Sequence, residues 1–270
     1  GVRSLTIYME PAPDEVNVAN NKVMGLLTVK NPEIVEVPQK YKTIQAAINN
    51  AYAGDTVKIA AGTYHEHIFI DKSINIVGET GRTIIDGSGE GAVVEVSSCS
   101  RANISGLTMR NGAYGLAISS SDQNEIVNNT ILGNVYGVEL FYSQTNILKN
   151  NRISNNNYNF GVEGESLLDF AQDIDASNTI NGMPIYFLLN ERGKHISGKA
   201  GLVVAVNSTN ITVANLTLKN NVQGVIFAYT NDSRIENLNL DNHEWGILLV
   251  KSFNNVVSNN AFSNCTYSID

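Results

Sequence analysis

The chain has 270 residues, of which 43% are hydrophobic and 16% are charged. This balance is too apolar and too weakly charged for a disordered polypeptide. The formal net charge of −8 disfavours nucleic acid and anionic membranes as partners, and no apolar run is long enough to predict a transmembrane segment.

The first 37 residues follow no repeat and form the first of two predicted regions, 1–37 and 38–270. Within them, Ser4 to Tyr8 and Val23 to Val29 are rich in strand-forming residues, and Pro11 and Pro13 favour a loop between the two. We expect this region either to cover the first coil of the fold that follows or to reach another subunit as an extended arm.

Residues 43–53 contain the one convincing helix, from Thr43 to Tyr52. Ile44, Ala47, Ile48 and Ala51 share one face of this helix, and Thr43 is a suitable N-cap. We expect the helix to cap the open end of the fold, whose first coil otherwise exposes apolar side chains and unpaired backbone groups.

A repeat of 22 residues dominates the rest of the chain. It is marked by asparagines at one repeated position, with Gly106 in the same position one step earlier, and by apolar residues two positions before and three positions after it. The asparagines are Asn128, Asn150, Asn215, Asn237 and Asn259. A period in the twenties with strand-like units indicates a solenoid in which each coil buries its inner face against its neighbours.

Short strands with alternating apolar residues favour an all-β parallel β-helix with about 22 residues per coil, rather than a leucine-rich repeat, whose Leu signature is missing. Equivalent residues then stack in columns, such as Ile104, Ile126 and Leu148. We expect the repeated asparagines to form an inward column at a left-handed bend, where their amides bond to one another. Residues of about 163–197 break the pattern, and we expect them to form an irregular excursion.

The stretch from Thr43 to Glu79 (TIQAAINNAYAGDTVKIAAGTYHEHIFIDKSINIVGE) resembles the opening of right-handed parallel β-helix proteins of the pectin-lyase-like superfamily. It is most similar to the NosD-like, carbohydrate-binding-and-sugar-hydrolase type. The stretch from Asp173 to Gly193 and the coils after it resemble archaeal cell-surface members of that group. The resemblance implies the fold, but the group includes lyases, hydrolases, esterases, binding proteins and surface proteins.

Sugar-cleaving members of the superfamily need clustered carboxylates. The best local cluster is acidic with basic residues downstream, and its candidate catalytic residues are Asp169, Asp173, Asp175 and Lys194, with Glu163, Glu165, Arg192 and His195 nearby. The alternative is a solvated acidic loop. A second polar group, Asp241, His243, Glu244 and Trp245, fits either a small sugar-binding patch or a polar turn with one aromatic side chain over the core.

His65 and His67 are two positions apart, so on a strand they face the same way and could contribute to a metal site if further ligands converge. Two surface histidines are the alternative, and we expect no cofactor. Cys99 and Cys265 are 166 residues apart, about seven coils of roughly 4.8 Å each, which is too far for a disulfide within one chain. They are therefore either unpaired or linked between subunits.

Five Asn-x-Ser/Thr sequons are candidate glycosylation sites: Asn103, Asn207, Asn210, Asn231 and Asn264. The sequons at Asn128 and Asn215 belong to the expected inward column, so we expect them to stay unmodified. From these features we expect an exported, non-enzymatic protein of the cell surface that assembles with itself into a layer, sheath or filament. The alternatives are a carbohydrate-active enzyme or sugar-binding module, with cell-surface polysaccharide as partner, and a NosD-like metal-handling accessory protein.

Overall fold

The computed structural model describes residues 2–16, 21–28 and 31–270, and its contacts divide the chain into two units between Glu33 and Ile34. In the first unit, β1 (Val2–Tyr8) pairs with β2 (Lys22–Thr28) in an antiparallel hairpin. Val29, the last residue of the second predicted strand, lies outside the described residues. No helix among the described residues is long and apolar enough to cross a membrane.

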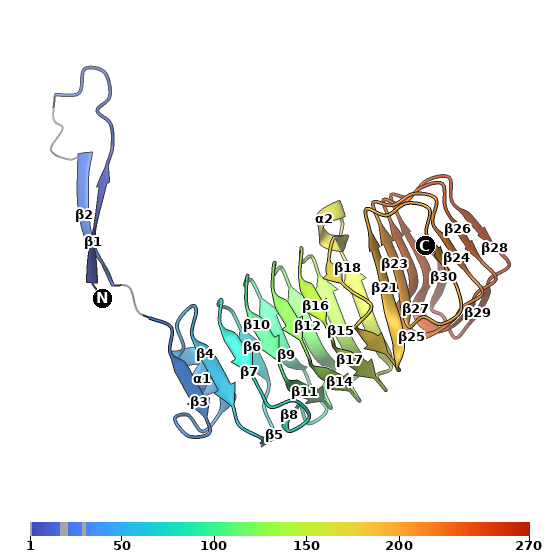
Figure 1. Cartoon of the computed structure of the whole chain (residues 1–270), viewed down its shortest axis with the longest axis horizontal. Helices are drawn as coiled ribbons and strands as arrows, with labels where there is room; N and C mark the ends of the chain where they lie inside the picture. The colour runs from blue at the N-terminus through green and yellow to red at the C-terminus, as the bar shows by residue number, and fades with distance from the viewer. Residues whose placement is uncertain (1, 17–20, 29–30) are drawn as a thin grey trace. The chain divides into compact units, whose positions relative to one another are not determined.

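The second unit begins with a stack of coils in which three parallel sheets run along the stack (Figure 1). The first sheet contains β3 (Ile34–Val37), β4 (Thr56–Ile59), β7 (Asn75–Val77), β10 (Asn103–Ser105), β13 (Glu125–Val127), β16 (Ile147–Lys149) and β19 (Asp173–Ile174). The second contains β5 (Gly62–Tyr64), β8 (Thr83–Asp86), β11 (Leu107–Arg110), β14 (Thr130–Leu132), β17 (Arg152–Ser154) and β20 (Thr179–Ile180). The third contains β6 (Ile68–Ile70), β9 (Ala92–Ser97), β12 (Tyr114–Ser119), β15 (Tyr136–Phe141) and β18 (Tyr158–Glu163).

A second stack of coils follows. One of its sheets continues from β20 of the first stack and contains β21 (Met183–Leu189), β23 (Leu202–Val206), β25 (Thr217–Ala228), β27 (Asn239–Val250), β29 (Ala261–Ser263) and β30 (Tyr267–Ile269). The other contains β22 (His195–Ile196), β24 (Thr212–Ala214), β26 (Arg234–Glu236) and β28 (Val256–Ser258). The fold is a right-handed parallel β-helix with about 22 residues per turn, which confirms the predicted fold class.

Columns of like residues fill the interior. Ile104 pairs in register with Ile126, and Ile126 with Leu148, and all three side chains are buried. Each coil therefore covers the apolar face of the one before it, which confirms this predicted column.

The predicted helix forms as α1 (Ile44–Asn50), with the Thr43 hydroxyl accepting a hydrogen bond from the Ala46 N–H at 3.2 Å. Ile44, Ala47 and Ile48 are buried, and the helix packs against β3, β4 and β6. It therefore covers the first coil. The β-helix begins earlier than the predicted boundary at residue 38, because β3 pairs in parallel with β4 from Ile34 onward.

The structure corrects the prediction for the repeated asparagines. Asn128, Asn150, Asn215, Asn237 and Asn259 have left-handed backbones, with φ between 55° and 58°, as expected for a tight bend. Their side chains are nevertheless exposed, so the sequons at Asn128 and Asn215 are exposed as well. The inward residue is the next one along the chain, because neighbouring side chains point to opposite faces.

Asn129 shows how the inward position works. Its amide oxygen accepts from the Leu107 N–H at 3.0 Å, and its amide nitrogen donates to the Ile104 carbonyl at 2.9 Å. The amide of Asn151, one coil further on, accepts from the Asn129 N–H at 3.0 Å and donates to the Ile126 carbonyl. Each buried amide thus satisfies the backbone of the preceding coil, where the bend interrupts the sheet hydrogen bonds.

The regular stack is interrupted within residues 163–197. The interruption contains α2 (Leu167–Phe170), which begins with a capping box between Ser166 and Asp169, and an antiparallel pairing between β20 and β21. Most of the second stack has its own hydrophobic core. The β20–β21 pairing joins the two stacks, and β25 also lies beside β18.

We predict that Asn129→Ala lowers the free energy of unfolding by about 2–4 kcal/mol, because it leaves the Leu107 N–H and the Ile104 carbonyl buried without partners, at about 1–3 kcal/mol each. Asn128→Gly is the matched control and should change it by less than about 1 kcal/mol, since glycine tolerates a positive φ. Chemical denaturation measures both. Equal losses in the two variants would contradict the assigned inward position.

Candidate functional site

A column of tyrosines lies on the third sheet of the first stack. Tyr114, Tyr136 and Tyr158 occupy equivalent positions on β12, β15 and β18, because the 22-residue period places them one coil apart. Their rings stack at centroid distances of 4.9 Å and 5.4 Å. The column presents a continuous aromatic surface along the β-helix.

Glu139 lies on β15 beside this column and is 3% exposed. Its neighbours across the sheet are Ala117 and Gly161, and a Cβ at Gly161 would lie only 2.6 Å from the Glu139 carboxyl oxygens. The small neighbours leave room for the carboxyl group, and its Oε1 atom has no hydrogen-bond partner. Burial, followed by the negative charges of Glu244 and Glu163, raises the pKa of Glu139 well above its ordinary value.

The second stack supplies the opposite wall. The Gln223 side chain on β25 accepts from the Val162 N–H and donates to the Val162 carbonyl, both at 3.2 Å. This double hydrogen bond joins β25 to the edge of β18. The next strand, β27, carries Glu244 and Trp245, and Glu244 accepts a hydrogen bond from the Tyr136 hydroxyl at 2.6 Å, which raises the pKa of Tyr136.

Together these residues line a pocket of about 140 Å³, which we call the Glu139 cleft. Its lining residues are Tyr114, Tyr136, Glu139, Phe141, Glu163, Val222, Gln223, Glu244 and Trp245. A second pocket, of about 170 Å³, adjoins it and shares Glu163, Gln223 and Trp245. A larger hollow of about 610 Å³ is lined by asparagines, glycines, a serine and a valine, so it holds no titratable side chain.

The predicted acidic cluster does not converge on this cleft, apart from Glu163. Asp169 caps α2 by accepting from the N–H groups of Glu165 and Ser166. Asp173 lies 3.5 Å from Lys149, and Asp175 holds the turn at Ser177. Lys194 pairs with Glu191 at 3.3 Å. The four candidates are therefore engaged in separate local contacts, as in the alternative of an acidic loop.

The two histidines proposed as metal ligands are not on a strand. His65 and His67 lie in the bend between β5 and β6, so the argument that they face the same way does not apply. The His67 ring bonds to the Ala92 carbonyl at 2.9 Å, and the His65 ring lies 4.0 Å from Asp86. Within the described residues, no three His, Cys, Asp or Glu side chains are grouped so that they could hold a metal ion.

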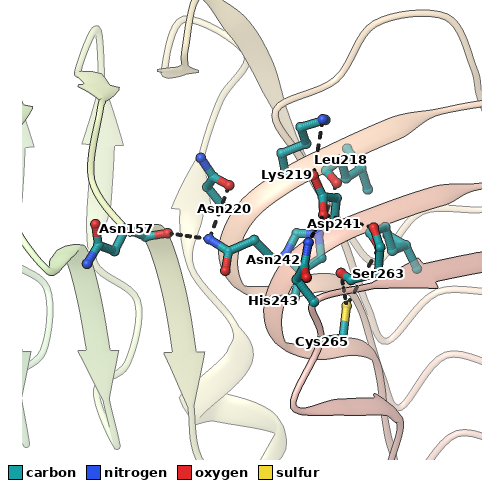
Figure 2. A network of polar contacts seen from close by, with 11 residues as sticks. Asn157, Leu218, Lys219, Asn220, Asp241, Asn242, His243, Ser263 and Cys265 are labelled. Carbon is teal, nitrogen blue, oxygen red and sulfur yellow. Dashed lines mark hydrogen bonds and ion pairs between the residues drawn. The ribbon is translucent and has the colours of Figure 1, made fainter.

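The second polar group predicted from the sequence, Asp241, His243, Glu244 and Trp245, lies within strand β27 rather than in a turn. Its members have different surroundings. Asp241 accepts hydrogen bonds from Ser263, Asn264 and Lys219, which lower its pKa to about 2 (Figure 2). These bonds tie adjacent coils together. Glu244 and Trp245 are the two members that reach the cleft.

His243 is fully buried and has a structural role (Figure 2). Its Nδ1 lies 3.2 Å from the Asn221 backbone nitrogen and 3.1 Å from the Asn221 carbonyl oxygen, and its Nε2 lies 3.0 Å from the Leu218 carbonyl oxygen. Burial lowers the pKa of this imidazole. It bonds the carbonyl 25 residues earlier, as the inward Asn134 does.

Both cysteines are free, and the Cys99 N–H donates to the Ser121 hydroxyl one coil further on, at 3.0 Å. The Cys265 Sγ lies 3.7 Å from the Leu240 carbonyl, 25 residues earlier (Figure 2). Cys99 is 4% exposed, so it is not accessible for a bond to another subunit. Of the candidate glycosylation sites, Asn207, Asn210 and Asn264 are exposed, whereas Asn103 and Asn231 are half-buried.

Glu139 and the tyrosine column were not predicted from the sequence, although a signal was present. The three tyrosines are spaced by 22 residues, as were the asparagines on which the repeat was recognised. Glu139 is a charged residue at a strand position that holds Ala117 one coil earlier and Gly161 one coil later. A charged residue with small neighbours on both sides in its column indicates a position with room for the carboxyl group.

Solved structures similar to this chain include an alginate lyase from Paenibacillus sp. str. FPU-7, with 15% identity, 86% of this chain and 76% of that chain covered, and a TM-score of 0.46. The open reading frame ORF18 of Geobacillus virus E2 has 12% identity, coverage of 92% and 65%, and a TM-score of 0.44. The A-module of the mannuronan C-5 epimerase AlgE6 of Azotobacter vinelandii has 14% identity, coverage of 82% and 74%, and a TM-score of 0.41. Likenesses this distant do not bear on activity.

No curated protein matches the chain significantly. The family model described as periplasmic copper-binding protein (NosD) matches residues 48–182 and, in a second match, residues 171–269. These two matches span most of the β-helix, from within α1 to β30. The chain therefore belongs to the NosD family.

Proposed function

We propose that this protein binds a carbohydrate in the Glu139 cleft and hydrolyses a glycosidic bond there. The observation that carries the proposal is the Glu139 carboxyl group, which is buried, has an unpartnered oxygen and lines an aromatic pocket. Most buried polar atoms have a hydrogen-bond partner, and a buried carboxyl group with a raised pKa in a pocket is a candidate for catalysis.

The walls of the cleft suit a sugar. The tyrosine rings stack on one another, so they present apolar ring edges and hydroxyl groups, and Trp245, which stacks on Tyr267 with one face, adds an indole ring. Together they offer apolar and polar contacts for the C–H groups and hydroxyl groups of a pyranose ring. The pockets of about 140 Å³ and 170 Å³ adjoin, and together they reach the lower end of the range of about 300–1,000 Å³ that small-molecule sites occupy. The stacked column of Tyr114, Tyr136 and Tyr158 extends the aromatic surface along the β-helix for a longer chain.

Glu139 and Glu244 are in different environments and have different roles in the proposed reaction. Glu139, whose pKa is raised, holds a proton that it can donate to the departing glycosidic oxygen as general acid. Water then forms the new bond to the anomeric carbon, and the Glu139 carboxylate takes the proton that this water loses. Glu244 accepts the Tyr136 hydroxyl and supplies the negative charge that stabilises the oxocarbenium-like transition state. Tyr136 positions Glu244 for this role.

The family's description names copper and the periplasm. The described residues do not fit a copper site, since His65 and His67 are engaged separately and no group of three potential ligands forms among them. The proposed reaction therefore includes no step at a metal ion. An exported location fits the family's description and is part of the proposal. Assembly into a layer, sheath or filament remains a prediction.

Glu139→Gln tests the proposed acid. We expect the release of reducing sugar from a panel of polysaccharides to fall by about 100- to 10,000-fold, the usual contribution of a general acid, while binding is retained. Glu95→Gln is the matched control, because Glu95 occupies the same column on β9 but lies outside the cleft. An unchanged rate in Glu139→Gln would overturn the assigned role.

The raised pKa of Glu139 also predicts a pH dependence of stability. The folded protein keeps this proton at pH values at which the unfolded chain has lost it, so the stabilisation is full below the ordinary value of 4.5 and is lost as the pH rises toward the raised pKa. We expect wild type to lose stability relative to Glu139→Gln as the pH rises above this value. Thermal melting over a pH series measures the difference, and parallel curves would contradict the prediction.

A further inference from the structure

The charges around the Glu139 cleft have one sign. Three of its described lining residues are glutamates, Glu139, Glu163 and Glu244, and none is lysine, arginine or histidine. The charges of Glu244 and Glu163 both act on Glu139, so the three carboxyl groups lie close enough to affect one another. The described lining of the adjoining pocket contains no basic residue either.

These negative charges disfavour sugars with a carboxylate and favour sugars with a positively charged group. The carboxylate of a uronic acid would meet like charges in a site with little water and no cation to offset them. An ammonium group would meet carboxylates and also the aromatic rings of Phe141 and Trp245, whose faces attract cations. A protonated amine also supplies N–H donors, which can donate hydrogen bonds to the carboxyl oxygens of the cleft.

We propose that the glycan recognised by this cleft carries free amino groups, as in polymers of unacetylated glucosamine, and that Glu163 is their partner. This inference rests on the proposed carbohydrate function. Glu163 is exposed and lines both pockets. It can therefore hold an amine on the sugar unit next to the one at Glu139, and Glu139 keeps its proton.

Three oligosaccharides of equal length test the proposal. A glucosamine hexamer, its fully N-acetylated counterpart and a galacturonate hexamer are titrated by calorimetry at a mildly acidic pH at which the amines are charged. We expect the glucosamine hexamer to bind at least tenfold more tightly than the N-acetylated one, and the galacturonate hexamer not to bind. The first two ligands share the backbone and differ in the acetyl groups, so their ratio isolates the amine.

Variants separate specific binding from general attraction between a polycation and an acidic protein. Glu163→Gln should reduce the preference for the glucosamine hexamer by about two- to fivefold, the effect of losing one charge pair at an exposed carboxylate. Glu165→Gln removes an equal charge two residues away, outside both linings, and should leave the preference unchanged. Trp245→Ala should weaken binding of all sugars, whereas general attraction would persist.

Each outcome decides one of the two proposals. Equal binding of the N-acetylated hexamer, or tighter binding of the galacturonate, would overturn the amine selectivity and leave the carbohydrate function standing. An equal loss of preference in Glu163→Gln and Glu165→Gln would overturn the role of Glu163. If none of the three sugars binds, and thermal melting shows the protein folded, the carbohydrate function fails as well.

Discussion

The hydrogen bonds that buried side-chain amides make to the backbone of the preceding coil support the whole fold. At each bend the strands end and the backbone loses its regular partners, yet the bend is buried between two coils. Asn124, Asn129 and Asn134 each accept from an N–H 22 residues earlier and donate to a carbonyl 25 residues earlier. Because the amide has both a donor and an acceptor, one side chain satisfies both backbone groups. The constant separation sets the length of the coil.

The same requirement explains residues that look functional in the sequence. His243 and Cys265 bond the carbonyls of Leu218 and Leu240, each 25 residues earlier, just as the inward asparagines do. Their polar atoms bond to backbone carbonyls of the preceding coil. A histidine and a cysteine in this position are therefore parts of the scaffold, although the same residue types in an exposed group would suggest a metal site.

The candidate site arises where this regularity fails. At the end of the first stack the chain leaves the coil to form α2, and β25 then meets β18 through the Gln223 side chain. Side-chain hydrogen bonds in place of a full strand pairing leave room between the two stacks. Glu139 from one stack and Glu244 from the other face that space. Because the Glu139 side chain is buried, its pKa is raised and it keeps its proton. An irregularity in the repeat therefore produces an environment that no regular coil contains.

The sequence by itself determined the repeat, the parallel β-helix, the capping helix at Thr43 and the apolar column of Ile104, Ile126 and Leu148, because these follow from local periodicity. It left open which asparagine of each bend points inward, since a shift of one residue reverses the face, and the prediction chose Asn128 where the structure buries Asn129. Only the tertiary structure determined which residues come together in the candidate site. Tyr136 and Glu244 are 108 residues apart in the chain, and their contact depends on how the two stacks meet, which no local pattern records.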